Sequence, residues 1–221
     1  MHRSSLLGRI RVLYVSPRAE RGDRRHYADE IAKIEAALAN ARSGVAVRLD
    51  KAEIRGLQEL LSALLVGTYD HIVLAGHGPS FGLCKGVAEQ RRQLWAAAFA
   101  EQLATICGNA CVLLMGCHTS WLSRELARRG LRGVSFDAAV PGGATSAFLY
   151  GYFAAIASGR SWETAFDVGC TSMAYDYHEH IPMTRSFGPA FDPEQGHYYE
   201  WLEHLTLIGD DDLDLDLEPQ E

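Results

Sequence analysis

A histidine and a cysteine each follow a short apolar run of the sequence and stand beside glycine in a turn. His77 comes after the run 71–75, within the letters GHG, and Cys117 comes after the run 111–115, within the letters GCH. A thiol attacks a carbonyl carbon as its thiolate, and a nearby imidazole can accept the thiol proton and later protonate a leaving amine. The two side chains therefore form a candidate dyad for nucleophilic catalysis.

The elements around this pair predict how its members would meet. Apolar strand patterns alternate with helical patterns along the chain, which predicts a mostly parallel sheet with helices on both faces, an α/β three-layer sandwich. Ligands of such sheets bind beyond the carboxyl ends of the strands. The expected strands are 10–15, 45–49, 71–75, 111–115 and 131–136, and the helical patterns run over 27–38, 57–65, 95–106, 122–129 and 145–158.

His77 and Cys117 lie 40 positions apart, which leaves room for one loop, one helix and one strand. Two neighbouring strands would bring them to one edge of the sheet. We expect Cys117 to open the next helix, whose exposed N–H groups favour a negative sulfur. Gly78 would let backbone approach a substrate closely, as the donor of an oxyanion hole must. The alternative is that these glycines only end strands, while the cysteine is inert and the histidine is a satisfied polar residue.

Length and composition predict one globular domain. The chain has 221 residues, of which 48% are hydrophobic and 22% charged, a mixture typical of soluble proteins that bury a sizeable core. We assign 1–209 to the domain and 210–221 to an acidic, disordered tail. Residues 174–201 are rich in Tyr, His and Pro without a clear period, and we interpret them as a surface loop, a hairpin or a lid that could serve activation or specificity.

Charge and hydropathy exclude two classes of partner. The net charge is −7, but the tail 210–221 holds seven acids and no base, so the remainder has 21 acidic and 21 basic residues. A neutral body gives no electrostatic reason to expect nucleic-acid binding. No run of 18 apolar residues is present, which excludes a membrane-spanning helix by this criterion.

The five cysteines, an odd number, predict free thiols in a reducing cytoplasm, because the first apolar run is too short and broken for a signal peptide. Cys111 and Cys117 cannot share a zinc ion if the chain between them is extended, since six residues span about 20 Å at the rise of a strand. We interpret Cys107 and Cys111 as core residues. The dyad chemistry needs no metal, and we expect no cofactor.

Three motifs resemble the CHAT family, caspase-like peptidases of the clan that also holds caspases, metacaspases and separase. The segment IVLAGHG (72–78) is similar to the family's strand ending in His-Gly, and CVLLMGCHTS (111–120) is similar to its strand ending in the nucleophile. The third motif is a helix, and the residues at the family's positions in it are Thr145, Phe148, Leu149, Tyr152, Phe153, Ile156 and Gly159. The segment from Trp162 to Asp167 fits the short helix that follows this motif in the family.

The resemblance implies a caspase-like fold and hydrolysis of a peptide bond through a thioester. By it, His77 is the general base, Cys117 is the nucleophile, and Gly78 and Cys117 supply N–H groups to the oxyanion. The substrate is then a protein. Bacterial members serve in antiphage defence, including cleavage of gasdermin-like pore formers, and that role is a candidate here by analogy. A chain without large sensor modules is expected to be activated by a partner protein, by cleavage or by self-association.

Two departures from related motifs weaken the case for an acidic specificity pocket. Metacaspases have an acid two residues before the nucleophile, where this chain has Met115, and many CHAT members have an acid three residues before the helix threonine, where it has Gly142. Asp137, just after the fifth strand, is the nearest substitute. A solvated turn aspartate is its other interpretation.

Two other functions stay open at this point. The chain could keep the caspase-like fold as a binding or regulatory module with its chemistry unused. It could also be a doubly wound hydrolase or a nucleotide-binding protein, which would require a pocket lined by glycine backbone near the first strand, where the sequence has Ser16-Pro17-Arg18.

Overall fold

The computed structural model describes residues 9–18, 21–40, 45–77, 89–141, 143–177 and 183–185. Strands and helices alternate from the first strand to the fifth helix, as the sequence predicts. The strands are β1 (Arg9–Pro17), β2 (Ala46–Ile54), β3 (His71–Ala75), β4 (Cys111–Met115), β5 (Arg132–Phe136) and β6 (Met183–Arg185). The helices are α1 (Arg21–Ala39), α2 (Leu57–Leu65), α3 (Glu89–Cys107), α4 (Ser120–Ala127), α5 (Ala144–Ala157) and α6 (Trp162–Tyr177).

These strands form one sheet in the order β2-β1-β3-β4-β5-β6. The first five are parallel, and β6 runs antiparallel to β5. Every residue of the central strands β3 and β4 is buried, which is why their sequences are almost purely apolar. Parallel pairing brings the carboxyl ends of β1, β3, β4 and β5 to the same end of the sheet. His77 and Cys117 lie at this end, and 'the edge of the sheet' beside these two residues refers to it.

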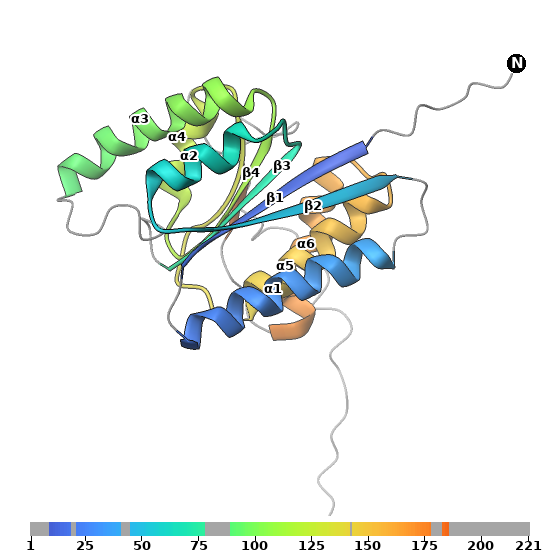
Figure 1. The fold of residues 1–221 in the computed structure, drawn as a ribbon. Helices are drawn as coiled ribbons and strands as arrows, with labels where there is room; N and C mark the ends of the chain where they lie inside the picture. The colour runs from blue at the N-terminus through green and yellow to red at the C-terminus, as the bar shows by residue number, and fades with distance from the viewer. Residues whose placement is uncertain are drawn as a thin grey trace, which may run out of the picture.

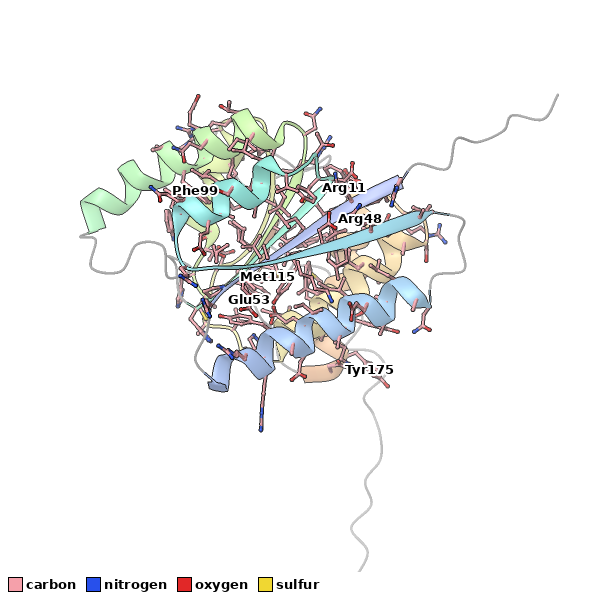
Figure 2. All side chains as sticks on the ribbon, in the orientation of Figure 1. Arg11, Arg48, Glu53, Phe99, Met115 and Tyr175 are labelled. Atoms are coloured by element: carbon pink, nitrogen blue, oxygen red, sulfur yellow. The ribbon has the colours of Figure 1, made fainter. Side chains whose placement is uncertain are left out.

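Helices cover both faces of the sheet, so the protein is a three-layer α/β sandwich (Figure 1). Buried residues of α1, α5 and α6 form one core with the inward side chains of one sheet face. Those of α2, α3 and α4 form the second core on the other face. Phe99 of α3 belongs to the second core and Met115 of β4 to the first, and Figure 2 labels both side chains. The predicted fold class is confirmed, and the arrangement is consistent with a caspase-like sandwich.

The segment after α5 differs from the sequence prediction. The helix expected over 162–167 continues to Tyr177, so residues 174–177 are helical and do not belong to a loop. Its buried positions continue the helical spacing as Ala165, Phe166, Gly169, Cys170 and Met173. Residues 183–185 then form β6, an outermost strand of the sheet. The remainder of the segment interpreted as a loop, hairpin or lid lies outside the described residues, as does the acidic tail.

The boundaries of other strands and helices differ from the sequence prediction by a few residues. β2 reaches Ile54, beyond the predicted end at residue 49, and alternates between exposed and less exposed positions, as suits a strand at the edge of the sheet. α3 begins at Glu89, earlier than its first apolar residues suggest. None of the helices in the described ranges combines the length and apolarity that crossing a bilayer demands.

Candidate active site

The register of β3 and β4 brings the two predicted residues to neighbouring positions. Ala75 pairs with Met115, and His77 and Cys117 each follow this pair by two residues. The N–H of Gly76 donates to the carbonyl oxygen of Met115 at 3.3 Å, so the strands stay paired up to the turn. Adjacent strands are about 4.8 Å apart. The two turns therefore leave the sheet side by side.

Both residues also belong to the same face of the sheet. Side chains alternate between faces along a strand, and Ala75 and Met115 both lie in the core beneath α1 and α5. His77 and Cys117 lie two residues further on, beyond the strand ends, so their own contacts show which face they belong to. The contacts agree, because His77 lies against α1, and Cys117 contacts Val140, which packs on the same core.

Cys117 stands in a turn before α4, which begins only at Ser120. The expectation that Cys117 opens this helix is therefore wrong. The N–H of Val140 donates to Cys117 Sγ at 3.3 Å, and an N–H aimed at sulfur complements negative charge there. His118 has a φ of 54°, a conformation that residues other than glycine adopt rarely and mainly in tight turns or strained functional segments.

Hydrogen bonds of Thr119 connect this turn to β5. Its side chain is completely buried, and its N–H donates to the carbonyl oxygen of Phe136 at 2.8 Å. In return, the N–H of Phe136 donates to Thr119 Oγ1 at 3.3 Å. The same hydroxyl donates back to the carbonyl oxygens of Gly116 at 3.0 Å and Leu114 at 3.2 Å. The residue two positions after Cys117 thus connects β4, the turn and β5.

The ring of His77 is exposed and lies beside two rings of α1. Its centroid is 6.4 Å from that of His26, with 26° between the ring planes, and 6.3 Å from that of Tyr27. An exposed imidazole held against a helix can reach a ligand at the edge of the sheet. The same exposure suits a base that must exchange protons during turnover.

Sequence reasoning missed a buried carboxylate behind this histidine. Glu30 of α1 is completely buried and accepts hydrogen bonds from the hydroxyls of Tyr14 and Thr145. Its Oε1 also lies 3.2 Å from His26 Nε2, a contact that is an ion pair when His26 is protonated. The pKa of Tyr14 is raised, first by burial and then by the charge of Glu30. The signal for this site was an acid within the inward stripe of α1, Tyr27–Glu30–Ile34–Ala37, at spacings of three and four residues.

The remaining predicted residues have mixed outcomes. Gly78, the expected oxyanion donor, lies outside the described residues, and so does Gly142. Asp137 follows β5 as predicted and is partly buried, and its carbonyl oxygen lies 3.2 Å from His118 Nδ1. Met115 is 2% exposed and contributes to the core, so the position two residues before Cys117 offers no group to a ligand.

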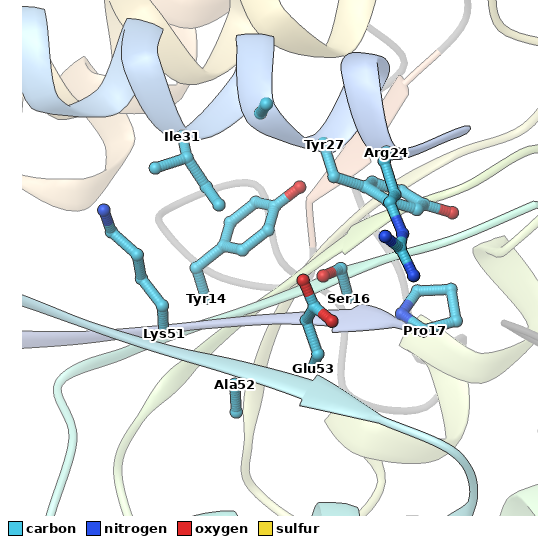
Figure 3. A pocket seen from close by; sticks show the side chains of 10 residues that line it. Tyr14, Ser16, Pro17, Arg24, Tyr27, Ile31, Lys51, Ala52 and Glu53 are labelled. Carbon is cyan, nitrogen blue, oxygen red and sulfur yellow. The ribbon is translucent and has the colours of Figure 1, made fainter. Parts of the chain in front are cut away.

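A pocket of about 240 Å³ lies between β1, β2 and α1. Figure 3 labels Glu53 of β2 and Arg24 of α1 among the side chains that line it, together with Tyr14 of β1 and Ile31 of α1. Tyr27 lines the pocket and also contacts His77, so the pocket adjoins the candidate site. No glycine is among its lining residues in the described part of the chain, so this pocket gives the nucleotide-binding alternative no support.

Two other cysteines, Cys107 and Cys111, lie at the start of β4 or just before it. Burial raises the pKa of Cys111 to about 12 and that of Cys107 to about 11, which suits core thiols. Tyr152 OH donates to Cys111 Sγ at 3.5 Å, far from the edge that carries Cys117, at the opposite end of β4. Among the described residues, no three or more His, Cys, Asp or Glu side chains are placed to hold a metal ion.

In comparisons with known proteins, no protein-family model matches the chain, and no curated protein matches its sequence.

Proposed function

We propose that the protein is a caspase-like cysteine endopeptidase that resembles the CHAT family, with Cys117 as nucleophile and His77 as general base. The observation that carries this proposal is the register of β3 and β4. In this register Ala75 pairs with Met115, and His77 and Cys117 each follow that pair by two residues. The N–H of Val140 directed at Cys117 Sγ adds support.

The proposed reaction proceeds in two halves. His77 accepts the proton of the Cys117 thiol while sulfur attacks the carbonyl carbon of the scissile peptide. Collapse of the tetrahedral intermediate breaks the C–N bond, and His77 gives its proton to the departing amine. Water then attacks the thioester, with His77 accepting a proton, and the acid and the free thiol are released. By the resemblance, the N–H groups of Cys117 and Gly78 would stabilise the oxyanion.

The proposed substrate is a protein, and a gasdermin-like pore former in antiphage defence is one candidate. The pocket between β1, β2 and α1 would take a side chain next to the scissile bond, because Tyr27 joins it to His77. Glu53 and Arg24 would then influence the preferred residue. We also propose cytoplasmic action, where a catalytic thiol stays reduced, and activation by a partner or by self-association.

The experiment is a comparison of new protein termini. The full chain is incubated with a cell lysate and with candidate partner proteins, and new N-termini are identified by mass spectrometry. We expect a set of termini that share a sequence preference and disappear in Cys117→Ala and His77→Ala. A Cys107→Ala variant is the matched control, since its thiol lies at the opposite end of the sheet, and it should cleave normally.

Termini that persist in Cys117→Ala would remove the mechanism. If neither the wild-type chain nor any activated form produced new termini, while ligands still bound at the sheet edge, the silent binding module would be the better account. Glu53→Gln tests the pocket separately, because it should alter the residue preference of cleavage without abolishing it.

A further inference from the structure

Glu30 is a buried carboxylate that the proposed reaction does not use directly. It has no exposed surface, and its partners come from three elements of the fold: Tyr14 of β1, Thr145 of α5 and His26 of its own helix. Removing a carboxylate from water costs several kcal/mol unless donors surround it. Two hydroxyls donate to it here, and His26 Nε2 lies 3.2 Å from its Oε1. The carboxylate is thereby held in one place.

The third of these partners leads to the candidate active site. His26 and Glu30 are one helical turn apart, and His26 Nε2 lies 3.2 Å from Glu30 Oε1. The other side of the contact is a ring stack, since the centroids of His26 and His77 are 6.4 Å apart with 26° between their planes. A continuous series of contacts therefore runs from the fixed carboxylate through His26 to His77.

His77 needs such support because it lies two residues beyond the end of β3 and is exposed. An exposed side chain in a turn samples several rotamers, and a base that is misplaced by about 1 Å can lose most of its effect. The hydroxyls of Tyr14 and Thr145 connect Glu30 to β1 and α5, and the contact with His26 extends that support to the exposed turn.

We propose that Glu30 and His26 are positioning residues that hold the imidazole of His77 in the orientation required for proton transfer with Cys117. This inference rests on the proposed function, because it assumes that His77 acts on Cys117. Glu30 orients the ring of His26, and the face of that ring limits the rotation of His77. Neither residue needs to touch substrate.

The test is a double-mutant cycle read out on Cys117 itself, so it needs no substrate. The rate constant for alkylation of Cys117 by iodoacetamide at neutral pH is measured by peptide mapping in the wild-type chain, His77→Ala, His26→Ala and the double variant. We expect His77→Ala to slow alkylation by about tenfold or more, and His26→Ala to slow it by a smaller factor, on the order of threefold to tenfold. In the His77→Ala background, removal of His26 should have no further effect.

Conservative variants keep the test independent of folding. His26→Phe retains a ring but not the contact with Glu30, and Glu30→Gln retains an acceptor but not the charge. Both variants should therefore give alkylation rates between those of the wild-type chain and His77→Ala. Glu35→Gln is the matched control on the same helix, because Glu35 is exposed and pairs with Lys51. It should react like the wild-type chain. Thermal melting identifies any variant that has lost its fold.

Each outcome is informative. If His77→Ala leaves alkylation unchanged, the proposed dyad fails. If His77→Ala slows alkylation but His26→Phe and Glu30→Gln, both folded, react at the wild-type rate, the dyad stands and the positioning inference is overturned. An effect of His26→Ala that persists in the absence of His77 would also overturn it, because His26 would then act by another route.

Discussion

Removal of one hydroxyl beneath the Cys117 turn should destabilise the protein measurably. In Thr119→Val a methyl group replaces the hydroxyl with little change in volume. The hydroxyl proton is shared by the carbonyl oxygens of Gly116 and Leu114, at 3.0 Å and 3.2 Å, and the hydroxyl oxygen accepts the N–H of Phe136 at 3.3 Å. Because Thr119 is 0% exposed, water cannot replace these bonds.

The magnitude follows from the groups left behind. A buried hydrogen bond contributes about 1 kcal/mol, and a buried N–H without a partner costs about 1–3 kcal/mol, so the free energy of unfolding should fall by about 2–4 kcal/mol. For a chain of 150–250 residues this lowers the melting temperature by about 4–16 °C.

The assay is thermal and urea unfolding of Thr119→Val beside Thr171→Val. The Thr171 hydroxyl donates only to the carbonyl oxygen of Asp167 on the exposed side of α6, and its loss should cost under about 0.5 kcal/mol. Thr119→Val should also change the alkylation rate of Cys117, since the turn loses its attachment to β5. Equal melting temperatures for the two valine variants would refute this account of the turn.

The remaining predictions concern packing, acid stability and thiol reactivity. Gly151→Ala should destabilise by about 1–3 kcal/mol, because the new Cβ would lie 2.7 Å from a carbonyl oxygen of α6; a Gly56→Ala control, whose Cβ meets nothing within 4 Å, should melt almost normally. Burial, and secondarily a nearby arginine, lowers the pKa of His71 to about 3, so the unfolded chain binds more protons between about pH 6.5 and 3. Stability should therefore be full above pH 6.5 and fall on acidification by at most about 1.4 kcal/mol for each pH unit from this group, and His71→Phe should reduce that slope in pH-dependent urea titrations. Iodoacetamide should leave Cys111 and Cys107 unlabelled in the native protein and label them after urea unfolding, because burial raises the pKa of both thiols; rapid native labelling of Cys111 would contradict its burial.

The fold was predictable from the sequence wherever a pattern of residues is typical of only one kind of secondary structure. β3 and β4 were predicted to the residue, because buried parallel strands are continuous apolar runs bounded by turn residues. The strand ends then gave the positions of His77 and Cys117. The end of α6 was missed because its buried stripe continues through Gly169, Cys170 and Met173, which carry a weaker hydrophobic signal than leucine or phenylalanine.

The network behind His77 was not predictable by the same means. Glu30 is bonded to Tyr14, 16 positions away, and to Thr145, 115 positions away. Only the tertiary structure brings these hydroxyls to the carboxylate, and only their presence makes burial of an acid tolerable. An acid in the inward stripe of a helix is a usable signal, but the sequence alone does not say what neutralises it.

The central claim is that sulfur and imidazole act together at the edge of the sheet, and a covalent probe measures this most directly. A library of peptidyl acyloxymethyl ketones, which form a thioether with the nucleophile of a cysteine peptidase, is incubated with the native chain and its peptides are mapped by mass spectrometry. The account predicts selective labelling of Cys117, dependent on the peptide sequence of the probe and lost in folded His77→Ala. Labelling that is equally fast in His77→Ala, or that falls on another cysteine, would contradict it.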